Sequence, residues 1–144
     1  MSNLSSASIE LDATADNVMQ VIMDFSSYPK WSGFQSALVL PKRENLNQVP
    51  VQFGLSVNGV SDSLTLGIAQ ISESEVSWTL IESNLLSVLE GKFKLTELPG
   101  ERCKVTYELE LRFKNSMMNL MKKALEGQMI EKLLRRLVDE VASR

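Results

Sequence analysis

The residues able to perform acid–base or nucleophilic chemistry are few, because the chain has no histidine and one cysteine, Cys103. Without histidine, Ser-His-Asp and Cys-His mechanisms are excluded, and so are the usual zinc sites. One cysteine cannot form an intrachain disulfide or a multi-thiolate cluster. Any chemistry would have to rely on carboxylates, tyrosine or lysine, and we expect neither a metal site nor a cofactor.

Three residues are the candidates for a catalytic role: Asp62, Glu82 and Tyr107. Both carboxylates continue the apolar alternation of their predicted strands, which would point them inward, where an unpaired carboxylate is costly. The alternative is that both are solvated carboxylates at the rim of the sheet. Tyr107 lies on the apolar side of its strand, so its hydroxyl needs a partner, either a ligand carbonyl or a neighbouring carboxylate.

Charge and hydropathy limit the partners of the chain. Its 144 residues carry 15 Lys and Arg against 18 Asp and Glu, a net charge of −3. Nucleic acid is not expected as a partner, because phosphate neutralisation needs clustered basic residues. The first twenty residues contain no Lys or Arg, unlike a signal peptide, and no apolar run is long enough to span a membrane. These features predict a cytoplasmic protein.

Alternation of apolar and polar residues predicts an antiparallel sheet between two helical regions. A strand over 8–13 precedes a helix over 15–25 that is capped by Thr14, and Tyr28-Pro29 ends that helix before a further short turn or helix. The remaining strands are expected at 34–40, 49–57, 60–71, 75–82, 85–97 and 103–113. Asn58-Gly59 predicts a type I′ hairpin turn, and a long amphipathic helix is expected over about 116–142.

This order of elements predicts a particular architecture. A sheet with one buried face and one long amphipathic helix must curl round that helix. The space between a curved sheet and a straight helix is hard to fill completely, so such folds tend to enclose a mostly apolar pocket.

The segment of the first helix also resembles a known family. Residues 18–25 followed by Tyr28-Pro29-Lys30-Trp31 are similar to the START-like, birch-pollen-allergen-like (SRPBCC) superfamily, in its polyketide cyclase/dehydrase and lipid-transport branch. Residues 91–95 and 104–109 resemble later strands of that branch. The resemblance implies an α+β helix-grip fold over residues 1–144 as one domain. It has about seven antiparallel strands wrapped round a long C-terminal helix, with two short helices after the first strand.

The resemblance further implies a hydrophobic ligand, such as a lipid, a quinone or a polyketide, bound between the sheet and the last helix. We expect large and adaptable apolar side chains to form the wall, although each is equally a plain core residue. The expected ligand-binding residues are Leu55, Leu66, Trp78, Phe93, Tyr107, Met117, Met121 and Leu125.

Two other functions remain open from the sequence. The first is a cyclase or dehydratase acting through Asp62, Glu82 or Tyr107. The second is a protein-interaction module resembling the quinone-binding and ribosome-association branch, with Phe34 or Leu46 in an exposed patch and no identified partner. Basic residues on the last helix allow at most a transient contact with a membrane surface.

Overall fold

The computed structural model describes residues 5–42, 47–57 and 59–144. Its elements are β1 (Ser5–Leu11), α1 (Ala15–Met23), the 3₁₀ turn η1 (Phe25–Ser27), α2 (Tyr28–Trp31), β2 (Ser36–Val39), β3 (Val49–Val57), β4 (Val60–Ser72), β5 (Glu75–Ser83), β6 (Leu86–Leu98), β7 (Arg102–Phe113), the 3₁₀ turn η2 (Met118–Met121) and α3 (Lys122–Ser143).

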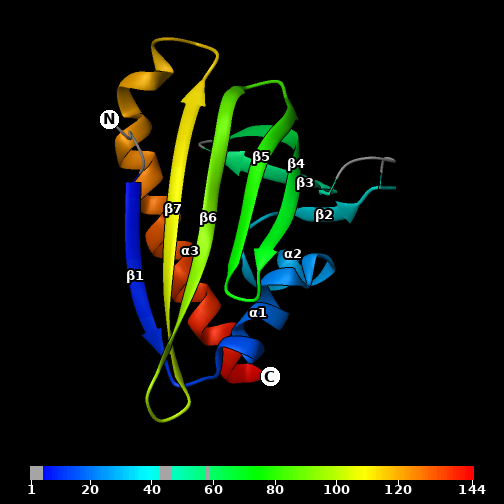
Figure 1. The fold of residues 1–144 in the computed structure, drawn as a ribbon. Coiled ribbons are helices and arrows are strands. Elements are labelled where there is room, and N and C mark those ends of the chain that lie inside the picture. Colours follow the sequence, from blue (N-terminus) through cyan, green and yellow to red (C-terminus); the bar gives the residue numbers. More distant parts are fainter. Residues whose placement is uncertain (1–4, 43–46, 58) are drawn as a thin grey trace.

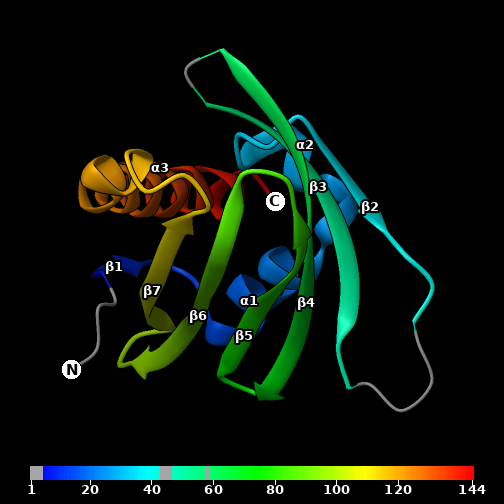
Figure 2. The same ribbon diagram turned by 90° about the horizontal axis from the view of Figure 1, so that it is seen from above.

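The seven strands form one antiparallel sheet in the order β1-β7-β6-β5-β4-β3-β2. α3 runs along β7 and β1 on one face of this sheet (Figure 1). Seen from above, the sheet curves round the side that carries the helices (Figure 2). The α+β helix-grip fold predicted from the sequence is therefore confirmed.

The ends of α1 follow from local chemistry. Thr14 is its N-cap, and the Thr14 hydroxyl accepts a hydrogen bond from the Asn17 N–H at 3.2 Å. Asp16 lies in the first turn, where a negative charge favours the helix dipole. Pro29 stands in the first turn of α2, the position where a proline removes no helical hydrogen bond. α1 ends at Met23 rather than at residue 25, because the chain passes into η1.

The last helix begins later than the sequence predicts. The expected start was residue 116, but α3 starts at Lys122 after the turn η2. The cause is Asn119, whose side chain accepts from the Phe113 N–H at 2.7 Å and donates to the Phe113 carbonyl at 3.0 Å. These two bonds hold the chain in a turn at the end of β7 and delay the helix.

The first strand differs from the prediction, and the expected hairpin turn is described only in part. The first strand spans Ser5–Leu11 rather than 8–13. Asn58 of the expected type I′ turn lies outside the described residues, whereas Gly59 has a φ of 81°, as a turn of that kind needs. β3 and β4 pair in antiparallel register on either side of it, up to the pair Val57 and Val60.

α3 is fastened to the edge of the sheet by Glu126, which is fully buried. Its carboxylate accepts from the Leu111 N–H at 2.6 Å and the Ser5 hydroxyl at 2.7 Å, and Lys123 Nζ lies 3.4 Å away. β1 begins at Ser5, opposite Leu109, so Leu111 lies beyond the described end of β1. The Glu126 carboxylate is thus the acceptor for this N–H.

Candidate functional site

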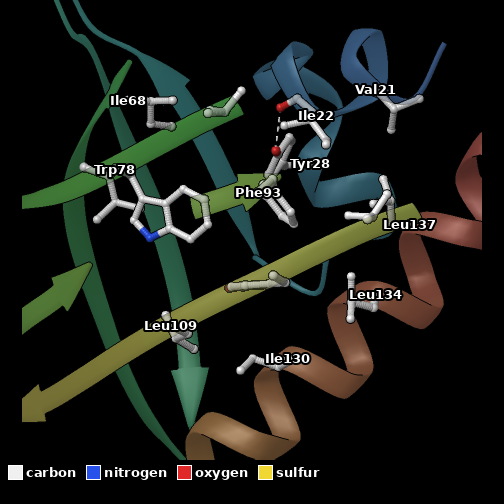
Figure 3. Packing of buried hydrophobic residues seen from close by; sticks show 14 of the residues in the cluster. Val21, Ile22, Tyr28, Ile68, Trp78, Phe93, Leu109, Ile130, Leu134 and Leu137 are labelled. Atoms are coloured by element: carbon white, nitrogen blue, oxygen red, sulfur yellow. Dashed lines mark hydrogen bonds between the residues drawn. The ribbon is translucent and has the colours of Figure 1, made fainter. Parts of the chain in front are cut away.

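The interior between the sheet and α3 contains a small cavity of about 50 Å³. Side chains from α1, η1, α2, most of the strands and α3 surround it, and Figure 3 shows part of this packing. Its walls are apolar or aromatic: Ile22, Phe25, Tyr28, Phe34, Phe53, Leu66, Ile68, Val76, Trp78, Leu89, Phe93, Tyr107, Leu109, Met129 and Leu133.

Three aromatic rings from adjacent strands form one wall. The centroid of the Trp78 ring on β5 is 5.2 Å from that of Phe93 on β6 and 5.6 Å from that of Tyr107 on β7. The Phe93 and Tyr107 centroids are 4.7 Å apart. Gly91 makes this arrangement possible, because a Cβ at that position would lie 2.7 Å from the Trp78 ring and 2.3 Å from the Glu108 carbonyl oxygen.

Rings from α2 and β3, together with the segment between α2 and β2, form the opposite wall. Tyr28 lies 5.7 Å from Phe53, and Phe34 lies 4.6 Å from Phe53, between ring centroids. The Tyr28 hydroxyl donates to the carbonyl oxygen of Ile22 on α1 at 2.5 Å, as drawn in Figure 3. The hydrogen-bonding capacity of this phenol is therefore used to hold α2 against α1.

Tyr107 differs from Tyr28 in this respect. Within the described residues, its hydroxyl makes no hydrogen bond, although the residue is only 5% exposed. Burial raises the pKa of Tyr107 well above the ordinary value of 10.0, so the phenol stays protonated and can donate. The indole N–H of Trp78 also has no hydrogen-bond partner in the described part of the chain. The aromatic wall thus carries two donors without intramolecular acceptors.

The cavity is small in this conformation. A volume of about 50 Å³ has room for a few water molecules at most, whereas ligand pockets usually measure several hundred Å³. Met129 on α3 has the adaptable side chain best suited to vacate space, and it is only partly buried. A ligand larger than a few atoms would require such side chains to move.

Four of the expected ligand-binding residues line the cavity: Leu66, Trp78, Phe93 and Tyr107. The other four are not part of its wall. Leu55 and Leu125 are half-buried and pack against the core outside the cavity wall. Met117 and Met121 are exposed, by 76% and 53%, because the turn at Asn119 directs them to solvent instead of continuing the helix.

The two carboxylate candidates differ from each other. Asp62 is buried, as the apolar alternation of its strand indicates, and not a solvated carboxylate. Its Oδ2 accepts from the Ser83 hydroxyl at 2.8 Å, while its Oδ1 has no partner in the described structure. Glu82 is exposed, which agrees with the alternative of a solvated carboxylate and not with an inward orientation. The pairing of β4 with β5 shifts by one residue between Thr65 and Leu66, and this irregularity reverses the alternation after Leu80.

Neither carboxylate contributes to the cavity wall. Asp62 shares the inner face of β4 with Leu66, but four residues of strand, about 13 Å, separate the two. Tyr107 is therefore the one catalytic candidate among the three that lines the cavity.

Several lining residues were not identified from the sequence. Tyr28 belongs to the segment that resembles the family, and Phe53 alternates with apolar neighbours on β3, so both carried a usable signal. Met129 and Leu133 lie on the apolar stripe of α3. Phe34, considered for an exposed interaction patch, instead lines the cavity, and Leu46 lies outside the described residues.

A search of protein-family models matches residues 11–138 to the polyketide cyclase/dehydrase and lipid transport family. The chain belongs to this family. The predicted membership of the START-like superfamily is confirmed with it. No curated protein matches the sequence significantly.

Solved structures resemble this family member in fold. A START superfamily protein from Mycobacterium smegmatis superposes with a TM-score of 0.88 at 19% identity, covering 97% of both chains. The ZhuI aromatase/cyclase from Streptomyces sp. R1128 gives 0.77 at 14% identity, covering 99% of this chain and 94% of that one. A conserved protein from Geobacillus kaustophilus superposes with a TM-score of 0.77 at 17% identity, covering 97% of this chain and 95% of that chain. At these identities the likeness shows the fold alone.

The described residues also give two general findings. No helix among them is long and apolar enough to cross a membrane. No group of three or more Cys, Asp or Glu side chains in this part of the chain could hold a metal ion.

Proposed function

We propose that this family member binds a small hydrophobic molecule in the cavity between the sheet and α3. The observation that carries the proposal is the composition of the wall, whose fifteen side chains are all apolar or aromatic. The match to a family described by lipid transport and by polyketide chemistry supports the same class of ligand.

The two unpartnered donors narrow the chemistry of the ligand. Trp78 and Tyr107 both line the cavity, and each has a donor that makes no hydrogen bond to the described residues. An indole N–H can only donate, and the Tyr107 phenol stays protonated, so the matching group on the ligand is a hydrogen-bond acceptor. The proposed ligand is therefore an apolar ring or chain that carries a carbonyl, as quinones and polyketides do.

Native mass spectrometry of freshly purified protein, compared with the denatured mass, tests this function. We expect a retained mass that denaturation releases. In a Met129→Trp variant we expect this mass to be lost, because the larger side chain fills the cavity at a cost of about 1–3 kcal/mol in stability.

The matched control is Gln128→Trp, which adds the same side chain at an exposed position on the neighbouring face of α3. It should retain the mass. Equal retention by the two variants would place the ligand elsewhere, and a clean apo mass together with no uptake of added naphthoquinone would contradict binding.

A further inference from the structure

The turn between β7 and α3 exposes three large apolar side chains. Met117, Leu120 and Met121 are 76%, 86% and 53% exposed. Positions three and four apart lie on the same side of a helical turn, so the three form one continuous apolar surface, here called the η2 tip. Figure 1 shows β7 ending and α3 beginning at the end of the molecule opposite the C-terminus, so the tip is a terminal surface.

The tip is held outward by hydrogen bonds. The Asn119 side chain bonds both the N–H and the carbonyl of Phe113, and the Asn115 side chain accepts from the Met117 N–H at 2.9 Å. Met118, between them, turns inward and packs against the core. The exposure of Met117 and Leu120 is therefore a property of an ordered turn, and it is present before any partner arrives.

Positive charge surrounds the η2 tip. Lys114 precedes it, and Lys122 and Lys123 follow it, while residues 113–125 contain no Asp or Glu. The first acidic residue after the tip is Glu126, which is buried and bound to the sheet and Lys123. With Glu126 included, residues 113–126 carry a net charge of +2 within a chain of net charge −3, which favours an anionic partner for this surface.

We propose that the η2 tip docks on anionic lipid bilayers. Methionine and leucine side chains would enter the boundary between headgroups and acyl chains, and the lysines would contact the anionic headgroups, with long aliphatic stems beside the apolar side chains. Apolar insertion and headgroup attraction are the two contributions that reversible membrane binding requires together.

One other exposed apolar side chain, Ile71, provides a contrast. Ile71 on β4 is 60% exposed, similar to Met121, but it stands close to Glu73 and Glu75 along the chain. Carboxylates beside an apolar side chain repel an anionic bilayer, so the proposal concerns the tip and not exposed apolar residues in general. It does not depend on the cavity or on any ligand.

Co-sedimentation with vesicles tests the proposal, using phosphatidylcholine alone and phosphatidylcholine mixed with phosphatidylglycerol. We expect binding to the mixed vesicles, weakened by added salt, and little binding to phosphatidylcholine alone. A Leu120→Ser/Met121→Ser variant should lose affinity at least tenfold, because its apolar contribution is removed. Lys122→Gln should lose about fivefold, the effect of one surface lysine.

The matched control is Ile71→Ser, which removes a similarly exposed apolar side chain and should bind like the unaltered protein. Leu120, Met121 and Ile71 are exposed and Lys122 is half-buried, and circular dichroism checks that each variant is folded. The proposal is overturned if the protein does not bind mixed vesicles, or if the Leu120→Ser/Met121→Ser variant binds them as tightly as the unaltered protein. It is also overturned if the protein self-associates in ultracentrifugation and this variant does not. The last result would assign the tip to a second copy of the chain.

Discussion

α3 packs on the sheet through two regions, which differ in whether their polar groups have hydrogen-bond partners. At the seam, where Glu126 joins α3 to β1 and β7, each buried polar group has a partner: the carboxylate meets the Leu111 N–H, the Ser5 hydroxyl and Lys123. At the cavity, the Tyr107 hydroxyl and the Trp78 N–H have no acceptor among the described residues.

The difference separates a structural role from a binding role. A buried charge is tolerable only when its hydrogen bonds are made, and at the seam they are. Donors that meet no acceptor fasten no element of the fold, so folding alone gives no reason to keep them at the cavity. A ligand with an acceptor group supplies that reason. The contrast predicts that mutations at the seam lower the free energy of unfolding and that no ligand restores it. Stability lost by mutation at the cavity should be restored in part by a ligand that fills the space.

Alkaline pH should give the largest effect, because both tyrosines of the chain lie in the cavity wall. Burial raises the pKa of Tyr28, with further contributions from Tyr107 and Asp24, and burial also raises the pKa of Tyr107. In the unfolded chain both phenols titrate near 10. Below that pH they add no pH dependence, and above it the unfolded state releases protons that the folded state retains, so stability falls as pH rises.

We therefore expect the phenolate absorbance of both tyrosines to appear together with unfolding, above pH about 10. The measurement is a pH titration followed by ultraviolet absorbance and by near-ultraviolet circular dichroism. One equivalent of phenolate in a protein with native circular dichroism would show that one ring is accessible to water.

Trp78→Ala should lower the free energy of unfolding by about 4 kcal/mol, because it removes a large ring from a packed wall. The enlarged cavity has the shape of the lost side chain, so added indole should restore part of the stability. Denaturant unfolding with and without indole measures this. The matched change at the seam is Ile130→Ala, which should cost about 3 kcal/mol and gain nothing from indole. Equal recovery of both variants would remove the distinction between the regions.

Glu126→Ala should lower the free energy of unfolding by about 3 kcal/mol, because the buried Leu111 N–H is left without an acceptor. Glu126→Gln retains a side-chain oxygen for this N–H, so its loss should be smaller. The contrasting change is Asp62→Asn, which keeps an acceptor for the Ser83 hydroxyl and affects an oxygen that has no partner. It should alter stability by less than about 1 kcal/mol. If the two amide variants, measured by urea denaturation, lost equal stability, Asp62 would be as structural as Glu126.

Much of the fold could be predicted because its signals are local. Period-two alternation fixes which face of each strand is buried, and it correctly placed Leu66, Phe93 and Tyr107 inside. The apolar stripe of the last helix and the segment around Tyr28-Pro29 indicated the helix-grip arrangement, which the structure confirms.

The errors arise where one side chain or one extra residue overrides the pattern. The irregular pairing beside Leu66 turns Glu82 outward, and the hydrogen bonds of Asn119 turn Met121 outward. Glu126 was not identified from the sequence, because no sequence pattern marks a carboxylate that accepts from a strand N–H 15 residues earlier. The cavity volume depends on how all these side chains pack together, and periodicity does not contain that information.

Tyr107→Phe should have the smallest effect on the empty protein and a selective effect on binding. Removing a hydroxyl that makes no hydrogen bond to the described residues should change the free energy of unfolding by less than about 1 kcal/mol. Affinity for naphthoquinone should fall about tenfold, or 1.4 kcal/mol, because its carbonyl loses a donor. Affinity for naphthalene, which has the same rings and no acceptor, should not change. Fluorescence titration of the tryptophans measures both ligands, and an equal loss for the two would mean that Tyr107 shapes the wall without donating to the ligand.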